Sequence, residues 1–190
     1  MIRRLIILLL IVGCMDEQTN CESSIIIDTS RGDCIIQLEF ANQVEFSISG
    51  DKRVIAANNI PEHKVGLFGH SAGSLNPNGI KEQNNTYEID ATPIKSSSIT
   101  ELINNGPEYS FGIMFNGIEL DPVAAEPWPH SGGVPPPLNA NWDWNLEASM
   151  VQIGLDCNDA HVQPTGKYHY HGVPTLYIEY LTYTQKESHT

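Results

Sequence analysis

Short β-prone runs separated by polar or glycine-containing breaks fill the chain between residues 24 and 57, and they constrain its fold more than any other feature. The runs lie at residues 24–28, 34–40, 44–49 and 53–57. Runs of this length and spacing are typical of an antiparallel sheet or of the edge of a sandwich. The sequence therefore predicts a mainly β fold.

A hairpin is predicted further along the chain, at Asn116-Gly117. These two residues lie between the apolar runs 109–115 and 118–120. Asn-Gly in such a place favours a two-residue turn with positive φ at both positions. We therefore expect two antiparallel strands that meet at Asn116 and Gly117.

Long loops and few helices complete the predicted fold. Residues 61–105 are rich in Asn, Gly, Ser and Pro and are interpreted as loop. Residues 128–137 hold too many prolines and glycines for regular structure. Residues 142–150 predict a short helix. The expected fold is an antiparallel, sandwich-like sheet with long loops and one or two short helices.

The N-terminus is typical of an exported protein. Arg3 and Arg4 precede an apolar run at residues 5–12, which is too short to cross a bilayer because a spanning helix needs about 20 residues. The run ends at Gly13-Cys14 and resembles the bacterial lipobox, in which the thiol is lipidated and cleavage follows the small residue. The alternative is an ordinary signal peptide with a chance cysteine.

These features divide the chain into four expected segments. They are a lipoprotein signal peptide at 1–13, a lipidated polar tether at 14–23, one β-rich domain at 24–183 and a polar tail at 184–190. Lipidation of Cys14 would anchor the domain to the membrane, on the extracytoplasmic side or surface of a bacterial cell envelope. The formal net charge of −13 argues against nucleic acid or an anionic lipid surface as partner, because both require basic patches.

Three cysteines remain if Cys14 is lipidated: Cys21, Cys34 and Cys157. Export permits disulfides. Cys21–Cys34 is the shorter closure, whereas Cys34–Cys157 would tie the first strands to the histidine-rich region. The sequence leaves both pairings open.

The densest group of chemically active residues lies at positions 156–172, where His161, His169 and His171 occur together. Side chains alternate along a strand, so His169 and His171 share one face and the tyrosines between them share the other. The turn signal at 164–166 predicts that the chain before it folds back on this strand. Two imidazoles on one face of a hairpin are a common start of a metal site.

The length of the turn decides whether His161 joins them. A three-residue loop at 165–167 places His161 opposite His171, with Asp159 on the same side. An even loop moves His161 to the tyrosine face. In the first case His161, His169, His171 and Asp159 would bind a transition metal such as zinc or copper. In the second case the histidines and tyrosines would form a structural hydrogen-bonded cluster.

A second motif, Gly69–Gly73, fits the G-x-S-x-G pattern of serine hydrolases, with Ser71 as nucleophile. The elbow requires a strand before it and a helix after it, and residues 74–79 would break a helix at once. We therefore interpret the motif as a glycine loop. Loop residues Asp121, Glu126 and His63 are weaker candidates for additional ligands.

The tetrapeptide Tyr168-His169-Tyr170-His171 resembles the motif of the YHYH family of exported proteins. Upstream segments resemble the same family in its order, and the resemblance runs from Val54 to Pro174. The matching segments are residues 59–63, 76–78 with Gln83, 115–122, 126–128 and 156–164. This resemblance implies metal binding by the histidine motif, without a settled activity. An Asp-Gly-x-Pro-Ile-Tyr segment expected after the motif is absent, so the chain looks truncated there.

The sequence thus predicts an exported, lipid-anchored domain that binds a transition metal through its His-x-His hairpin. Two alternatives remain open: a metal-dependent hydrolase, and a surface interaction module with a structural histidine cluster. A protein or ligand partner is not identified by the sequence.

Overall fold

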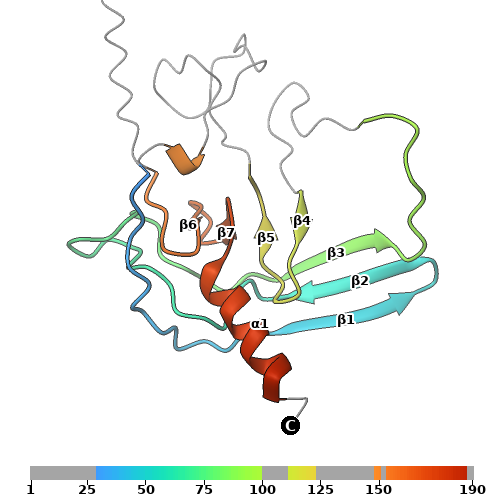
Figure 1. Ribbon diagram of the computed structural model, residues 1–190, viewed down its shortest axis with the longest axis horizontal. Helices are drawn as coiled ribbons and strands as arrows, with labels where there is room; N and C mark the ends of the chain where they lie inside the picture. The colour runs from blue at the N-terminus through green and yellow to red at the C-terminus, as the bar shows by residue number, and fades with distance from the viewer. Residues whose placement is uncertain (1–28, 100–110, 123–147, 151–152, 188–190) are drawn as a thin grey trace, which may run out of the picture.

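The computed structural model of the chain describes residues 29–99, 111–122, 148–150 and 153–187 (Figure 1). The fold is mainly β, as predicted, and it consists of two small sheets and one α-helix. The predicted signal peptide and lipid-bearing segment, with Cys14 and Cys21, lie outside the described residues. None of the described helices has the length and apolar character that a membrane span requires.

The first sheet contains β1 (Val44–Ser49), β2 (Lys52–Ala57) and β3 (Asn85–Asp90), all antiparallel and in that order. It projects to one side of the molecule (Figure 1). The runs predicted at 44–49 and 53–57 form β1 and β2. The prediction of loop at 61–105 is wrong for the residues of β3. Tyr87 and Ile89 alternate with polar residues there, and the strand completes the sheet against β2.

The second sheet has the order β4-β5-β7-β6. Its strands are short, and their bounds are β4 (Gly112–Ile113), β5 (Glu119–Leu120), β6 (Ala160–Val162) and β7 (Tyr168–Tyr170). Strands β4 and β5 form one antiparallel pair and β6 and β7 form another, but β5 runs parallel to β7, with Leu120 opposite Tyr170. This parallel pair brings segments about 50 residues apart in sequence side by side, and it was not predicted.

The turn between β4 and β5 contains Asn116 and Gly117, as predicted, but its geometry differs. Gly117 has a φ of 78°, whereas Asn116 does not have positive φ. The Gly117 amide donates to the carbonyl of Met114 (2.9 Å), and the Met114 amide donates to that of Ile118 (2.9 Å). This is a three-residue loop, a type I turn followed by one left-handed residue, which requires positive φ only at Gly117.

The main core lies under the second sheet. Tyr168 and Tyr170 of β7 are fully buried there, together with Val65, Ile118 and Val162. The disulfide Cys34–Cys157 joins the first described segment to the turn before β6, which selects one of the two pairings that the sequence left open. A main-chain bridge between Gly32 and Asp156 holds the same two segments together, and a second bridge joins Ile36 to Val65.

Two helical elements follow the long loops. The 3-10 turn η1 (Ala148–Met150) lies in the region predicted as a short helix, whose residues 142–147 are outside the described part. Helix α1 (Thr175–Glu187) was not predicted, and the expected polar tail at 184–190 begins inside it. Its β-branched and aromatic residues are poor helix formers, but Pro174 before the first turn fixes a backbone angle that suits a helix start.

Candidate metal centre

The β6–β7 hairpin positions the three histidines. Its loop has three residues, Pro164 to Gly166, and the Gln163 amide donates to the Lys167 carbonyl (2.9 Å) to close it. Gly166 has a φ of 91°, a conformation that favours glycine. The predicted odd loop is confirmed, one residue earlier than expected, so His161 lies opposite His169 rather than His171. An odd loop in either place leaves all three histidines on one face.

The three imidazole rings form a nearly equilateral triangle. Their centroids are 4.7 Å (His161–His169), 4.8 Å (His161–His171) and 4.7 Å (His169–His171) apart. One nitrogen from each ring lies within 4.8 Å of the other two. The Nε2 atoms of His161 and His171 are 3.1 Å apart. Among the described residues, this is the group of three or more potential metal ligands that the fold assembles.

Burial keeps these imidazoles neutral. His169 and His171 are 2% and 7% exposed, and His161 is partly exposed. Burial lowers the pKa of His161, and burial together with the neighbouring imidazoles lowers that of His169 well below its usual value. The pKa of His171 falls to about 3, mainly through burial and also through His161. Neutral imidazoles have the lone pairs that a metal ion needs.

Backbone carbonyls orient two of the rings. Nδ1 of His161 lies 3.2 Å from the carbonyl oxygen of Ile153, and Nδ1 of His169 lies 3.4 Å from that of Lys167. A proton on each Nδ1 would bond to the carbonyl and leave Nε2 free to bind an ion. Nδ1 of His171 is buried and has no hydrogen-bond partner within the described residues. The cluster therefore offers an unused nitrogen as well as two oriented ones.

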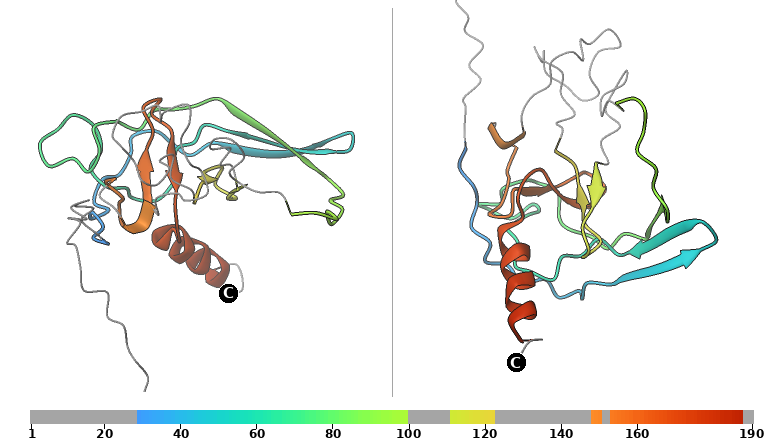
Figure 2. Two further views of the ribbon diagram at one scale, coloured as in Figure 1. Left: turned by 90° about the horizontal axis from the view of Figure 1, so that it is seen from above. Right: turned by 45° about the vertical axis from the view of Figure 1, so that its right-hand side comes forward.

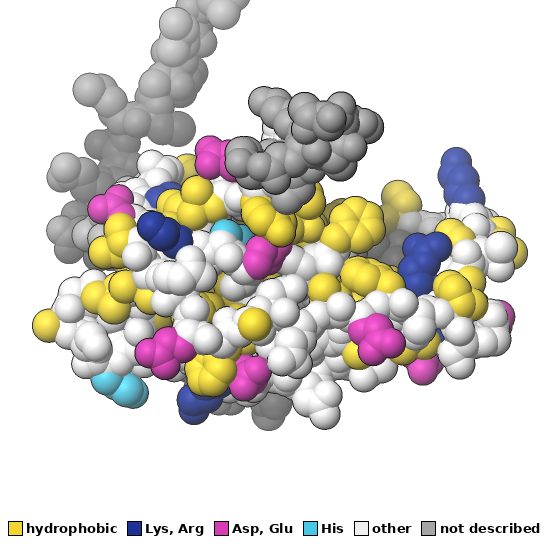
Figure 3. All heavy atoms as spheres, turned by 90° about the horizontal axis from the view of Figure 1, so that it is seen from below, with side chains coloured by type: hydrophobic (Ala, Val, Ile, Leu, Met, Phe, Trp, Pro, Cys, Tyr) yellow, Lys and Arg dark blue, Asp and Glu magenta, His cyan; other side chains and the backbone are white. Residues whose placement is uncertain are grey.

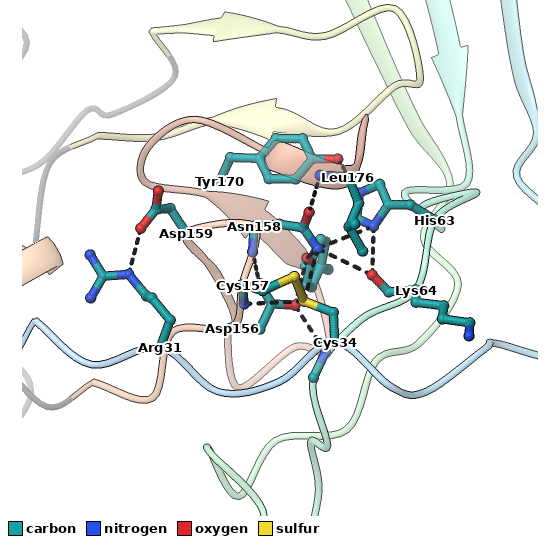
Figure 4. Close-up of a disulfide and its surroundings, with 12 residues drawn as sticks. Arg31, Cys34, His63, Lys64, Asp156, Cys157, Asn158, Asp159, Tyr170 and Leu176 are labelled. Atoms are coloured by element: carbon teal, nitrogen blue, oxygen red, sulfur yellow. Dashed lines mark hydrogen bonds and ion pairs between the residues drawn. A yellow bond between two sulfur atoms is a disulfide. The ribbon is translucent and has the colours of Figure 1, made fainter. Parts of the chain in front are cut away.

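Asp159, the fourth predicted ligand, lies beside the triangle but not in it. Its carboxylate accepts a hydrogen bond from Nε of Arg31, with which it forms an ion pair (Figure 4). Its carbonyl accepts from the His171 amide (2.7 Å), so the residue still positions a histidine through the main chain. Arg31 was missed because its only signal in the sequence is a positive charge in a turn.

Strand β5 adds two acids to the histidine face. Leu120 pairs with Tyr170 and packs on the core, so its neighbours Glu119 and Asp121 lie on the opposite face, with Asp121 level with His171. The Asp121 amide donates to the carbonyl of Tyr170 (2.8 Å), and Asp121 is 3% exposed. Sequence analysis noted Asp121 only as a loop acid, because the parallel pairing of β5 with β7 is not encoded locally.

The tyrosine face of the hairpin carries a separate polar network (Figure 4). Tyr170 donates its hydroxyl proton to Nε2 of His63 (2.7 Å), and Tyr168 donates to the carboxylate of Asp156 (2.8 Å). The Asn158 side-chain amide donates to the carbonyl of Lys64 (3.1 Å). His63 is thus a buried structural residue on the far side of the hairpin from the triangle.

The hydrolase motif does not form a triad. Ser71 is exposed in a loop. Asp156 accepts hydrogen bonds from the Gly66 amide and from Tyr168 on the tyrosine face, whereas His161 lies on the other face. The interpretation as a glycine loop is consistent with this arrangement. Glu126, the other loop acid considered, is outside the described residues.

Comparison with protein families gives a match that covers the histidine motif. The model described as "YHYH protein" matches residues 86–190, which is more than half of the 190-residue chain. Searches of curated proteins and of solved structures gave no match. The motif that names the family is the strand β7 with His171 after it. By this match, the chain belongs to the YHYH family.

Proposed function

We propose that the protein binds one transition metal ion, zinc or copper, through His161, His169 and His171. The observation that carries the proposal is the convergence of three neutral imidazoles, from two strands, on one point. Imidazole is a preferred ligand of both metals. The alternative role is a purely structural cluster, in which the Nε2 atoms of His161 and His171 share a hydrogen bond (3.1 Å).

The donor set fits such an ion. Three nitrogens bound to tetrahedral zinc at about 2.0–2.1 Å lie about 3.3 Å from one another. The two Nε2 atoms of His161 and His171 are already 3.1 Å apart, and the third nitrogen is within 4.8 Å of both. Small rotations of the rings would therefore complete the set. The carbonyls of Ile153 and Lys167 provide the outer hydrogen bonds that metal-binding histidines usually make.

A second candidate function is metal-dependent hydrolysis. It is favoured by the number of clustered ligands, because three protein ligands leave a fourth tetrahedral position for water in catalytic zinc sites. A bound ion would supply a nucleophilic hydroxide at neutral pH. Alternation along β5 directs Asp121 to the same face, and we propose this carboxylate as the acceptor of a proton from that water.

Metal analysis of protein purified without a histidine tag tests the proposal. We expect a single zinc or copper ion per chain and saturable binding in calorimetry at neutral pH. His169→Ala, or the milder His161→Gln at the partly exposed position, should abolish binding. His70→Ala, an exposed loop histidine, is the matched control and should bind as the parent does. Binding that survives both cluster variants, or no saturable binding by the parent, would refute the proposal.

We also propose that the domain is exported and anchored through a lipid on Cys14. The disulfide Cys34–Cys157 supports export, because disulfides persist in oxidising compartments. Cys14→Ser should abolish lipid labelling and processing in a bacterial host. Mass spectrometry of the parent protein that shows a mature N-terminus other than lipidated Cys14 would contradict the anchor.

A further inference from the structure

The sheet β1-β2-β3 has two unlike faces. Pairing places Phe46 opposite Ile55 and Ile48 opposite Arg53, and Arg53 is in turn opposite Ile89. One face therefore carries mainly large apolar side chains. The other face carries polar and charged side chains, and Lys52 there pairs with Asp90. Because the sheet projects from the rest of the molecule (Figures 1 and 2), the second sheet covers only part of its apolar face.

The apolar face forms one wall of a hollow of about 600 Å³. Ile55 in its lining is buried, and Phe115 of the β4–β5 turn also lines it, with its ring centroid 6.2 Å from that of Phe46. Ile48 and Phe115 are 66% and 77% exposed, and Phe46 and Ile89 are exposed as well. Figure 3 shows hydrophobic side chains at the surface in several separate patches among polar ones. A contiguous exposed apolar patch of this kind often marks a binding surface.

Arg53 supplies the charge in this hollow. Its neighbours on both adjacent strands, Ile48 and Ile89, are apolar. Arg31, Lys52 and Lys167 each form an ion pair with a carboxylate, whereas Arg53 forms none within the described part of this acidic chain. A guanidinium presents a planar fork of donors that matches a carboxylate or a phosphate.

We propose that this hollow binds a single anionic amphiphile, with its apolar chain against Phe46, Ile55 and Phe115 and its carboxylate on Arg53. The volume lies in the range of small-molecule sites, and an apolar lining with one oriented polar group is their usual composition. The ligand enters as a free molecule rather than as part of a membrane. The net charge of −13 repels an anionic bilayer as a whole, but one Arg still attracts one head group. The site is separate from the histidine triangle and does not depend on metal binding.

Binding of dodecanoate to the full chain, measured by calorimetry below the micellar concentration, tests this assignment. We expect saturable binding, and Arg53→Gln should weaken it about tenfold, the effect of losing one charged hydrogen bond. Lys52→Gln is the matched control, because it removes a positive charge from the adjacent residue on the opposite face. Ile48→Ser should weaken binding of both dodecanoate and dodecanol, since it removes apolar contact alone.

Three outcomes would overturn the assignment. One is that the parent protein does not bind dodecanoate saturably. Another is that Arg53→Gln and Lys52→Gln bind it equally, while circular dichroism shows both to be folded. The third is that the face binds something other than dodecanoate. This would be either phosphatidylglycerol vesicles, or a second copy of the chain in a concentration-dependent dimer that Ile48→Ser abolishes. These last results would assign the face to a membrane or to a second copy of the chain.

Discussion

His161 lies directly opposite His169 across the β6–β7 hairpin, and the three residues between Gln163 and Lys167 determine that it does. In a β-hairpin, a shift of one residue moves every side chain of a strand to the other face. The histidine triangle is therefore a consequence of turn length as much as of histidine spacing. This relationship can be tested without substituting any of the three histidines.

Insertion of one glycine after Gly166 should abolish metal binding. A four-residue loop either turns His161 to the tyrosine face or forces the two strands to pair in a different register. Calorimetry with zinc should therefore show loss of the parent affinity. The control is a glycine inserted after Gly73, in an exposed loop where a Cβ added to Gly73 would meet nothing within 4 Å. If the insertion after Gly166 folds and binds zinc as tightly as the control, the register argument is wrong.

Gly117 should tolerate substitution far less than Gly50, although both have positive φ, 78° and 60°. A methyl group at Gly117 would lie 2.5 Å from Cβ of Ala57, whereas one at Gly50 would meet nothing within 4 Å. Gly50→Ala should lower the free energy of unfolding by about 1 kcal/mol through backbone strain alone. Gly117→Ala should lower it by about 1–3 kcal/mol more through overpacking. Urea titration compares the two, and equal losses would contradict the close approach of the two sheets.

Local signals in the sequence predicted the parts of the site that are local. Alternation along Tyr168–Tyr170 and an odd turn place the three histidines on one face, and both are properties of a few adjacent residues. The parallel pairing of β5 with β7 depends on contacts about 50 residues apart, so the sequence did not place Asp121 beside the histidines. Arg31 was missed for the same reason, because its pairing with Asp159 spans 128 positions.

The same division between local signals and long-range contacts applies to the fold. Strands β1 and β2 follow from β-prone runs on either side of a tight turn. Strand β3 begins with Asn85, directly after Asn84, and was predicted as loop, because only its register against β2 gives it a sheet to join. Helix α1 has the composition of a strand, and its start is fixed by tertiary contacts. One of these is the hydrogen bond from the Leu176 amide to Asn158 (3.0 Å).

The stability contributed by Asp156 should decrease as pH rises. Burial raises the pKa of this carboxyl, against hydrogen bonds from Gly66, Asn158 and Tyr168 that lower it. An acid whose pKa is higher in the folded state stabilises most below its unfolded pKa, about 3.9, and loses that contribution as pH rises through the folded pKa. The stability of the parent relative to Asp156→Asn, which does not titrate there, should therefore fall with rising pH in this window. A difference that grows with pH would show that the hydrogen bonds outweigh burial.

Asp121 should matter more for metal affinity than Asp159 does. Asp121 is buried on the histidine face, level with His171, so its negative charge would favour a cation held by the three rings. The carboxylate of Asp159 is paired with Arg31 and touches the site only through its backbone carbonyl. Asp121→Asn should weaken zinc binding about tenfold, because it removes a negative charge from the neighbourhood of the cation. Asp159→Asn should leave zinc affinity close to that of the parent, because the carboxylate it replaces is paired with Arg31. Competition titration with a zinc chelator measures both variants. Stronger loss of affinity in Asp159→Asn than in Asp121→Asn would restore Asp159 as the carboxylate of the site.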